Sequence, residues 1–169
     1  MLSKESIKRA KNNFANYQRE GLIKKVALNK NILAILTQNS EESLIEAQKT
    51  SSALWKIVMS YYSMFYIANA VLLKNGYKVG DQIAHKVTSD ALIVLVKEKL
   101  NKELLENYEE ARNQALSTMK ADEIIQSFEY ERAKRSKFQY TTTEKAKENK
   151  AQTSINRAKE FMLAMKKLL

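Results

Sequence analysis

The sequence predicts an all-α protein, an up-and-down bundle of five to seven helices. With no proline and only three glycines among 169 residues, few of the turns needed for repeated β-hairpins or Gly-rich phosphate loops can form. Apolar residues recur with the 3.6-residue helical period. The segment 53–76 is apolar or aromatic on nearly every helical face, so it must be surrounded by other helices or by lipid. A chain of this length is most simply one domain, residues 1–169.

The segment 53–76 is expected to be the enclosed central helix of the bundle rather than a membrane span. Lys56, Lys74, Ser60, Ser63 and Asn69 make it too polar for a confident span. The N-terminus has no apolar run typical of a secretory signal. The absence of cysteine fits a reducing compartment. We therefore expect a cytoplasmic protein with no membrane association.

The first half of the chain predicts three helices. The first spans Lys4 to Arg19 and stops near Gly21, and an apolar connector, residues 22–28, follows it. A second helix begins after Asn29, and the sequence leaves open whether it breaks around residues 38–40. The central helix ends at residues 75–76, because glycine tolerates the left-handed conformation common after a helix.

The second half of the chain predicts a loop over residues 77–81 and then further helices. Apolar residues from Ile83 to Leu100 indicate one helix. Asn101 is expected to cap the next, which is long and charged and extends from 104 to about 138. Thr141 and Glu144 have the spacing of a capping box at the start of a final amphipathic helix.

Few residues of the chain are suited to catalysis or metal binding. The only histidine, His85, lies outside any nucleophile-elbow pattern. Gln82 stands where a Glu-x-x-His di-metal motif needs glutamate, so we expect neither metal nor cofactor. His85 follows a loop at a helix start, where a surface or capping role is the ordinary interpretation and a general base is the alternative.

An aromatic cluster on the central helix, Tyr61, Tyr62, Phe65 and Tyr66, is expected to pack in the core, where each buried phenol needs a hydrogen-bond partner. A neighbouring stripe of mostly small residues would let another helix approach closely, from the same chain or a second copy; it comprises Ser60, Ser63, Ile67 and Ala70. The net charge of +10 fits either a solvated lysine-rich surface or a polyanionic partner.

In these residues the chain resembles the HEPN family of small helical nucleotide-binding and RNase-related domains, in its stand-alone prokaryotic and archaeal branch. The resemblance covers essentially the whole chain. It rests on the order and spacing of an N-terminal element at residues 20–23, the central helix, His85 and a C-terminal Arg-x4-Tyr element. The matching positions are Trp55, Tyr61, Tyr62, Met64, Phe65, Ala68, Ala70, Leu72, Leu73, Gly76, Tyr77, Arg135, Tyr140, Ala158 and Phe161.

The resemblance implies a homodimer that binds a nucleotide or RNA. It also implies a minimal nucleotidyltransferase as partner, in a two-component module of toxin–antitoxin type. Arg132, Arg135 and Tyr140 would line the anion-binding cleft, with His85 as a contributor. RNase members of the family carry an Arg-x4–6-His motif, but no histidine follows either arginine here, and the catalytic residues are left unassigned. The alternatives are a divergent metal-independent endoribonuclease and a purely structural or partner-recognition bundle.

Overall fold

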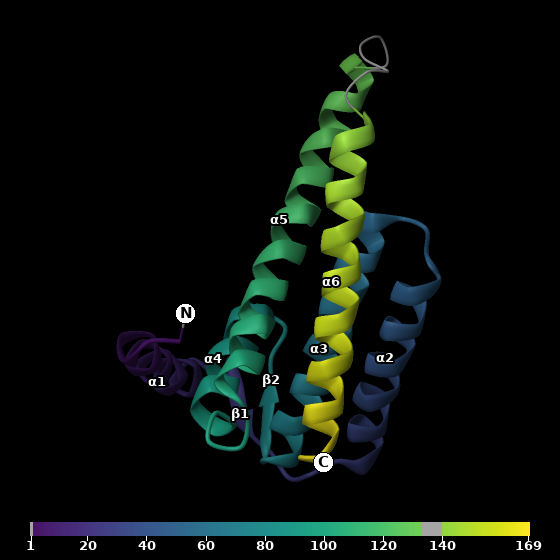
Figure 1. Cartoon of the computed structure of the whole chain (residues 1–169). Helices are drawn as coiled ribbons and strands as arrows, with labels where there is room; N and C mark the ends of the chain where they lie inside the picture. The colour runs from purple at the N-terminus through teal and green to yellow at the C-terminus, as the bar shows by residue number, and fades with distance from the viewer. Residues whose placement is uncertain (1, 133–139) are drawn as a thin grey trace.

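The computed structural model describes the backbone of residues 2–132 and 140–169, and the side chains of residues 2–120 and 147–169. The described residues form six helices and two short strands: α1 (Lys4–Arg19), β1 (Ile23–Lys25), α2 (Lys30–Lys49), α3 (Ala53–Lys74), β2 (Tyr77–Val79), α4 (Ala84–Leu95), α5 (Lys102–Arg132) and α6 (Tyr140–Lys166). Figure 1 shows α2, α3, α5 and α6 running alternately up and down, with α1 and α4 to one side. The predicted all-α bundle is confirmed.

Helix α3 lies at the centre of the bundle and packs against α2, α4, α5 and α6. Met64, Ile67, Ala68 and Leu72 are completely buried along it, as expected for a helix with apolar residues on most faces. Among the described helices, only α3 is long and apolar enough to cross a membrane, and 67% of its most apolar window is buried inside the bundle. The predicted position of this helix is confirmed.

The small residues of α3 pack against α2 of the same chain. The Ser40 hydroxyl donates a hydrogen bond of 2.8 Å to the backbone carbonyl of Ser63, and both residues are completely buried. Such a bond requires the two helix backbones to approach closely, which small side chains permit. Of the two predicted neighbours for this stripe, the structure therefore shows the one from the same chain.

The connector and the loop that flank α2 and α3 form a two-stranded antiparallel ribbon, which the sequence analysis did not predict. Ile23 of β1 pairs with Val79 of β2. Gly76 turns the chain out of α3 with φ of +84°, so the predicted helix end is confirmed. At Gly80 an added Cβ would lie 3.3 Å from the Leu22 carbonyl oxygen, and the Gly80 N–H donates to that same oxygen at 2.8 Å.

The helix boundaries agree with some of the predicted ends and differ from others. Helix α2 is continuous through residues 38–40. The Asn101 side chain accepts a hydrogen bond of 3.0 Å from the Glu103 N–H at the start of α5, as expected of a capping residue.

Two predicted boundaries are wrong. Helix α4 ends at Leu95, so the helix predicted from Ile83 to Leu100 is too long. Helix α6 begins at Tyr140, two residues before the start that an N-cap at Thr141 requires. The predicted end of the long helix near 138 lies outside the described residues.

The central position of α3 predicts a large stability cost for a cavity at its buried face. Replacing the fully buried Leu72 by alanine should lower the free energy of unfolding by about 2–5 kcal/mol, because apolar burial is lost and a cavity remains. Leu163→Ala is the matched control, since Leu163 is 61% exposed, and its cost should stay below about 0.5 kcal/mol. Urea denaturation followed by circular dichroism measures both, and equal costs would contradict the central role of α3.

Candidate functional site

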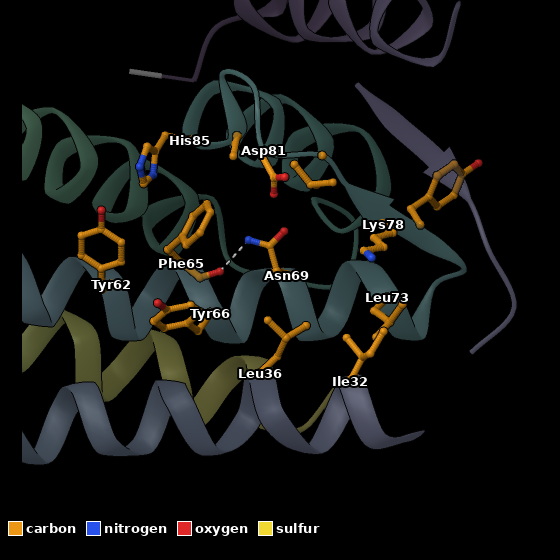
Figure 2. Close-up of a pocket in the computed structure, with 14 residues that line it drawn as sticks. Ile32, Leu36, Tyr62, Phe65, Tyr66, Asn69, Leu73, Lys78, Asp81 and His85 are labelled. Carbon is orange, nitrogen blue, oxygen red and sulfur yellow. Dashed lines mark hydrogen bonds between the residues drawn. The ribbon is translucent and has the colours of Figure 1, made fainter. Parts of the chain in front are cut away.

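A cavity of about 300 Å³ lies beside α3, where β2 and the start of α4 cross over it. Figure 2 shows α2 forming one wall, with Ile32 and Leu36, while the loop before α4 brings Asp81 and His85 to the opposite side. The lining is mainly apolar and aromatic, with a few polar groups. It comprises Ile32, Leu36, Tyr62, Phe65, Tyr66, Asn69, Leu73, Tyr77, Lys78, Val79, Gly80, Asp81, Ala84 and His85.

The chain enters α4 through an unusual backbone conformation at Ile83. This residue caps the helix with φ of 44° and ψ of 30° and provides no side-chain hydrogen bond. A β-branched residue in the left-handed region costs about 1–2 kcal/mol. The sharp turn places Ala84 and His85, in the first turn of α4, against the cavity. His85 is therefore not the helix cap, so the capping interpretation is wrong, although its side chain is half-buried and still reaches the surface.

His85 is held by the buried phenol of Tyr61. The Tyr61 oxygen and His85 Nδ1 are 2.8 Å apart. Burial raises the pKa of Tyr61 well above its ordinary value, so the phenol keeps its proton and can donate a hydrogen bond to Nδ1. Burial, with a smaller contribution from the Arg112 cation, lowers the pKa of His85. The imidazole is thus neutral near pH 7, and when it accepts a hydrogen bond at Nδ1 its own proton is on Nε2.

Three half-exposed aromatic rings surround His85 and line the cavity. The ring of Phe65 lies 4.6 Å from the His85 ring between centroids, and Tyr62 meets His85 edge-on at 5.8 Å. Tyr66 lies 6.0 Å from Tyr62. The prediction that the whole aromatic cluster packs in the core holds fully for Tyr61. Tyr62 and Phe65 are partly buried against the core, Tyr66 is partly buried, and all three line the cavity.

The polar groups of the cavity are arranged around Asn69. Its Nδ2 donates to the Phe65 carbonyl at 2.9 Å and lies 3.3 Å from Oγ1 of the buried Thr88. These contacts fix the amide plane, as Figure 2 shows for the Phe65 contact. Lys78 and Asp81, both exposed, lie on the loop side of the cavity. The site therefore offers amide and carboxylate acceptors beside a cation.

A polar network behind the cavity joins α1, α4 and α5. Asp90 accepts hydrogen bonds from the Tyr17 hydroxyl at 2.9 Å and from Asn13 Nδ2 at 3.0 Å. Burial, and then the hydrogen bond to Asp90, raises the pKa of Tyr17 far above its usual range. The cation of Arg112 opposes this increase, because a nearby positive charge lowers the pKa of Tyr17, and it has the same effect on the pKa values of Tyr61 and Tyr108. Nothing in the sequence singled out Arg112.

One buried phenol next to this network has no hydrogen-bond partner among the described residues. Tyr108 is 1% exposed, and its hydroxyl makes no hydrogen bond of ordinary geometry. Its ring stacks on Phe161 with 5.2 Å between centroids and lies 5.9 Å from the Tyr61 ring. Burial raises the pKa of Tyr108 well above its ordinary value. Within the predicted aromatic cluster, the buried phenol Tyr61 has the expected partner, His85.

Of the predicted site residues, His85 is the one whose side chain the structure describes. His85 lines the cavity, whereas Arg132 ends α5, 20 residues beyond Arg112, which corresponds to about 30 Å of helix. The side chains of Arg132 and Tyr140 and all of Arg135 lie outside the described residues. Within residues 2–120 and 147–169, no three His, Cys, Asp or Glu side chains form a metal-binding group. The cavity aromatics, Asn69, Lys78 and Asp81 were not predicted as site residues.

Comparisons with protein-family models, curated protein sequences and solved structures find no match for this chain. The resemblance to the HEPN family stays a prediction. The candidate site is therefore defined by its own geometry, namely the cavity, the aromatic rings around it and the Tyr61–His85 pair.

The lowered pKa of His85 predicts a pH-dependent contribution to stability. Between the unfolded value of about 6.5 and the lower folded value, the unfolded chain binds the proton more readily, so stability falls as pH falls through that interval. His85→Gln should remove this component. Urea denaturation of both proteins at several pH values from 7.5 to 5 should show a smaller loss of stability in the variant. Parallel pH profiles would contradict a neutral, buried imidazole.

Proposed function

We propose that this helical bundle binds a nucleotide, free or as an unpaired residue of RNA, in the cavity beside α3. The observation that carries the proposal is the set of three half-exposed aromatic side chains, Tyr62, Phe65 and Tyr66, around a space of about 300 Å³. Proteins commonly hold unpaired bases by stacking them on aromatic faces. The volume is at the lower end of the range for small-molecule sites, about 300–1,000 Å³, which suits one base.

The polar groups of the cavity suit the edge of a base. The Asn69 Nδ2 group is engaged by the Phe65 carbonyl and Thr88, so the amide is held in place and its Oδ1 can accept a hydrogen bond from a base edge. The carboxylate of Asp81 accepts from the exocyclic amino group or ring N–H of a base. Stacking would therefore supply affinity, while Asn69 and Asp81 would fix the orientation of the base.

The cation and the start of α4 suit the phosphate. Lys78 is an exposed ammonium on β2 that lines the cavity. Ile83 gives α4 no side-chain cap, so among the described residues the N–H groups of Ala84 and His85 have no partner. Unpaired N–H groups and the helix dipole favour an anion at this end. The net charge of +10 would attract polyanions over a longer range.

The resemblance to the HEPN family supports a wider setting for this activity. It favours a cytoplasmic homodimer that works with a minimal nucleotidyltransferase in a two-component module of toxin–antitoxin type. We do not propose ribonuclease chemistry, because His85 is the only histidine and precedes both Arg132 and Arg135 in the sequence. Binding, rather than cleavage, is the activity that the cavity supports.

The aromatic contact predicts the effect of removing one ring. Phe65→Leu keeps an apolar side chain beside His85 but removes the aromatic face, so nucleotide affinity should fall about fivefold or more, since stacking contributes about 1–3 kcal/mol per base. Isothermal titration at low ionic strength with each of the four ribonucleoside triphosphates measures this change. The proposal fails if none of the four binds the native protein, or if the variant binds as tightly as the native protein.

The phosphate contact predicts a change in salt dependence. Lys78→Ala should weaken binding and lower the slope of log affinity against log salt by about one, as expected for the loss of one phosphate contact. Lys74→Ala is the matched control, because Lys74 is an exposed lysine at the end of α3 that does not line the cavity. The same titrations repeated at several salt concentrations give both slopes. Equal slopes in the two variants would assign the effect to net charge alone.

A further inference from the structure

A groove extends from the cavity along the boundary between α2 and α3. Two adjoining hollows of about 300 and 420 Å³ share Glu46 and Met59, and the first also shares Tyr66 with the cavity. Among the residues whose side chains the structure describes, these hollows are lined from α2, its C-cap residue and α3. They are Asn39, Glu42, Ser43, Glu46 and Lys49 of α2, the C-cap Thr50, and Trp55, Met59 and Tyr66 of α3.

The floor and one wall of this groove follow the spacing of a helix-packing seam. On α3 the groove-lining residues Trp55, Met59 and Tyr66 are half-buried or exposed and are separated by four and seven positions. On the opposite wall, the separations are four, three and four positions, from Asn39, Ser43 and Glu46 of α2 to its C-cap residue Thr50. Alternation of three and four places side chains along one stripe of a helix, the arrangement into which another helix packs.

The groove exposes apolar surface to solvent. Trp55, which lines it, is 50% exposed, and the adjoining Met59 is half-buried. Exposed apolar stripes bordered by polar residues commonly mark protein-binding sites, and tryptophan is among the residues most enriched at binding hot spots. A polypeptide occupant with apolar side chains would bury this surface.

The charge of the α2 wall indicates which kind of ligand the groove can bind. In a chain of net charge +10, this wall carries the carboxylates of Glu42 and Glu46. Lys49 pairs with Glu46 at 3.2 Å, and Glu42 accepts only the neutral Gln38 amide, at 2.7 Å, among the described residues. A carboxylate wall repels phosphate and attracts lysine or arginine. The groove is therefore unsuited to RNA and complementary to a basic polypeptide.

The described part of this chain has no helix with an exposed apolar seam that could fill the groove of a second copy. Outside the groove region, the exposed large apolar residues are Leu28, Ile35, Ile45, Ile83 and Leu163. Leu163 is the only one on α6, Ile83 and Leu28 lie outside the helices, and Ile35 and Ile45 lie on the groove-forming α2 itself. None of the described helices offers a further exposed apolar seam with a spacing of three and four residues.

We propose that the α2–α3 groove between Asn39 and Trp55 binds an amphipathic helix of a partner protein, with an apolar seam facing Trp55 and Met59 and basic residues facing Glu42 and Glu46. Such a helix would pack into the groove as a helix packs between two others. It would cover about three turns of α3, from Trp55 to Tyr66, about 16 Å. This site is separate from the proposed nucleotide contacts of Asn69, Lys78 and Asp81.

The single tryptophan of the chain reports on this groove directly. Trp55 is the only tryptophan, so its fluorescence can be followed in the intact protein. The probe is a synthetic 14-residue helical peptide with leucine at alternating three- and four-residue spacing and lysine at the flanking positions. Two control peptides have glutamate in place of lysine, or the same composition with the leucines shuffled. Only the first should shift Trp55 emission to shorter wavelength and protect it from acrylamide quenching, with at least fivefold higher affinity than either control.

The α2 wall is tested by a matched pair of charge reversals. Glu42→Lys should weaken binding of the lysine peptide about fivefold through loss of one attraction and gain of one repulsion. Glu160→Lys makes the same change in net charge at an exposed position of α6 and should leave affinity unchanged. Phe65→Leu should also leave it unchanged, so this test and the nucleotide test can fail independently.

Four results would overturn the proposal. The first is no Trp55 shift with the lysine peptide, and the second is equal affinity for the lysine and glutamate peptides. A third is an equal loss of affinity in Glu42→Lys and Glu160→Lys, which would indicate only a general charge effect. The fourth is a Trp55 shift that appears with rising protein concentration alone, or with an oligoribonucleotide, because the groove would then hold a second copy or RNA.

Discussion

The enclosure of α3 is the constraint on which the rest of the structure depends. A 22-residue helix with apolar side chains on most faces gains stability only when neighbours cover it, at roughly 25 cal/mol per Å² of apolar surface removed from water. Helices α2, α5 and α6 supply most of that cover, and α4 and β2 supply part of the remainder. Small residues at Ser40 and Ser63 allow α2 to approach closely enough to contribute. The order of the bundle follows from this requirement.

The functional surface is the part of α3 that these neighbours leave incompletely covered. Trp55, Met59, Tyr62, Tyr66 and Asn69 form a stripe along the helix that is half-exposed or exposed. At one end of the stripe the loop before α4 crosses over it and forms the cavity, while at the other end α2 borders it. The same helix therefore serves as core on most faces and as a binding surface on one. The left-handed Ile83 belongs to this arrangement, because strained residues persist where the surrounding structure holds them.

The sequence was sufficient to predict the elements of the fold that depend on local or periodic signals. The bounds of α1, the Asn29, Asn101 and Gly76 helix ends and the central position of α3 all have such signals. The β1–β2 ribbon has none, because its three-residue strands are separated by the whole of α2 and α3. Among the site residues, His85 was singled out because it is the sole histidine and because it belongs to the pattern that resembles the HEPN family.

The exposed aromatics show the limit of reasoning from hydrophobicity. Tyr61 and Tyr62 are adjacent in a uniformly apolar helix, yet the first is buried against His85 and Tyr108 and the second borders the cavity. The difference depends on which face α2 and α4 leave uncovered, and that is a property of tertiary packing. Lys78 and Asp81 likewise can be identified as site residues only from the structure, where β2 and the loop after it bring them to the cavity. Periodicity predicted the helix and could not predict its exposed face.

The two ends of the exposed stripe differ in charge, and this difference separates the two proposed ligands. At the cavity, Lys78 and the uncapped start of α4 favour an anion. Along the groove, Glu42 and Glu46 favour a cation. A polyanion that entered the groove would have to desolvate phosphates beside carboxylates, which is strongly unfavourable.

The two proposed sites share one side chain, because Tyr66 lines both the cavity and the groove. A helix bound in the groove and a base bound in the cavity would both contact the Tyr66 ring. Occupancy of either site would then restrict the rotamers of Tyr66, and any coupling between the sites would have to act through that restriction.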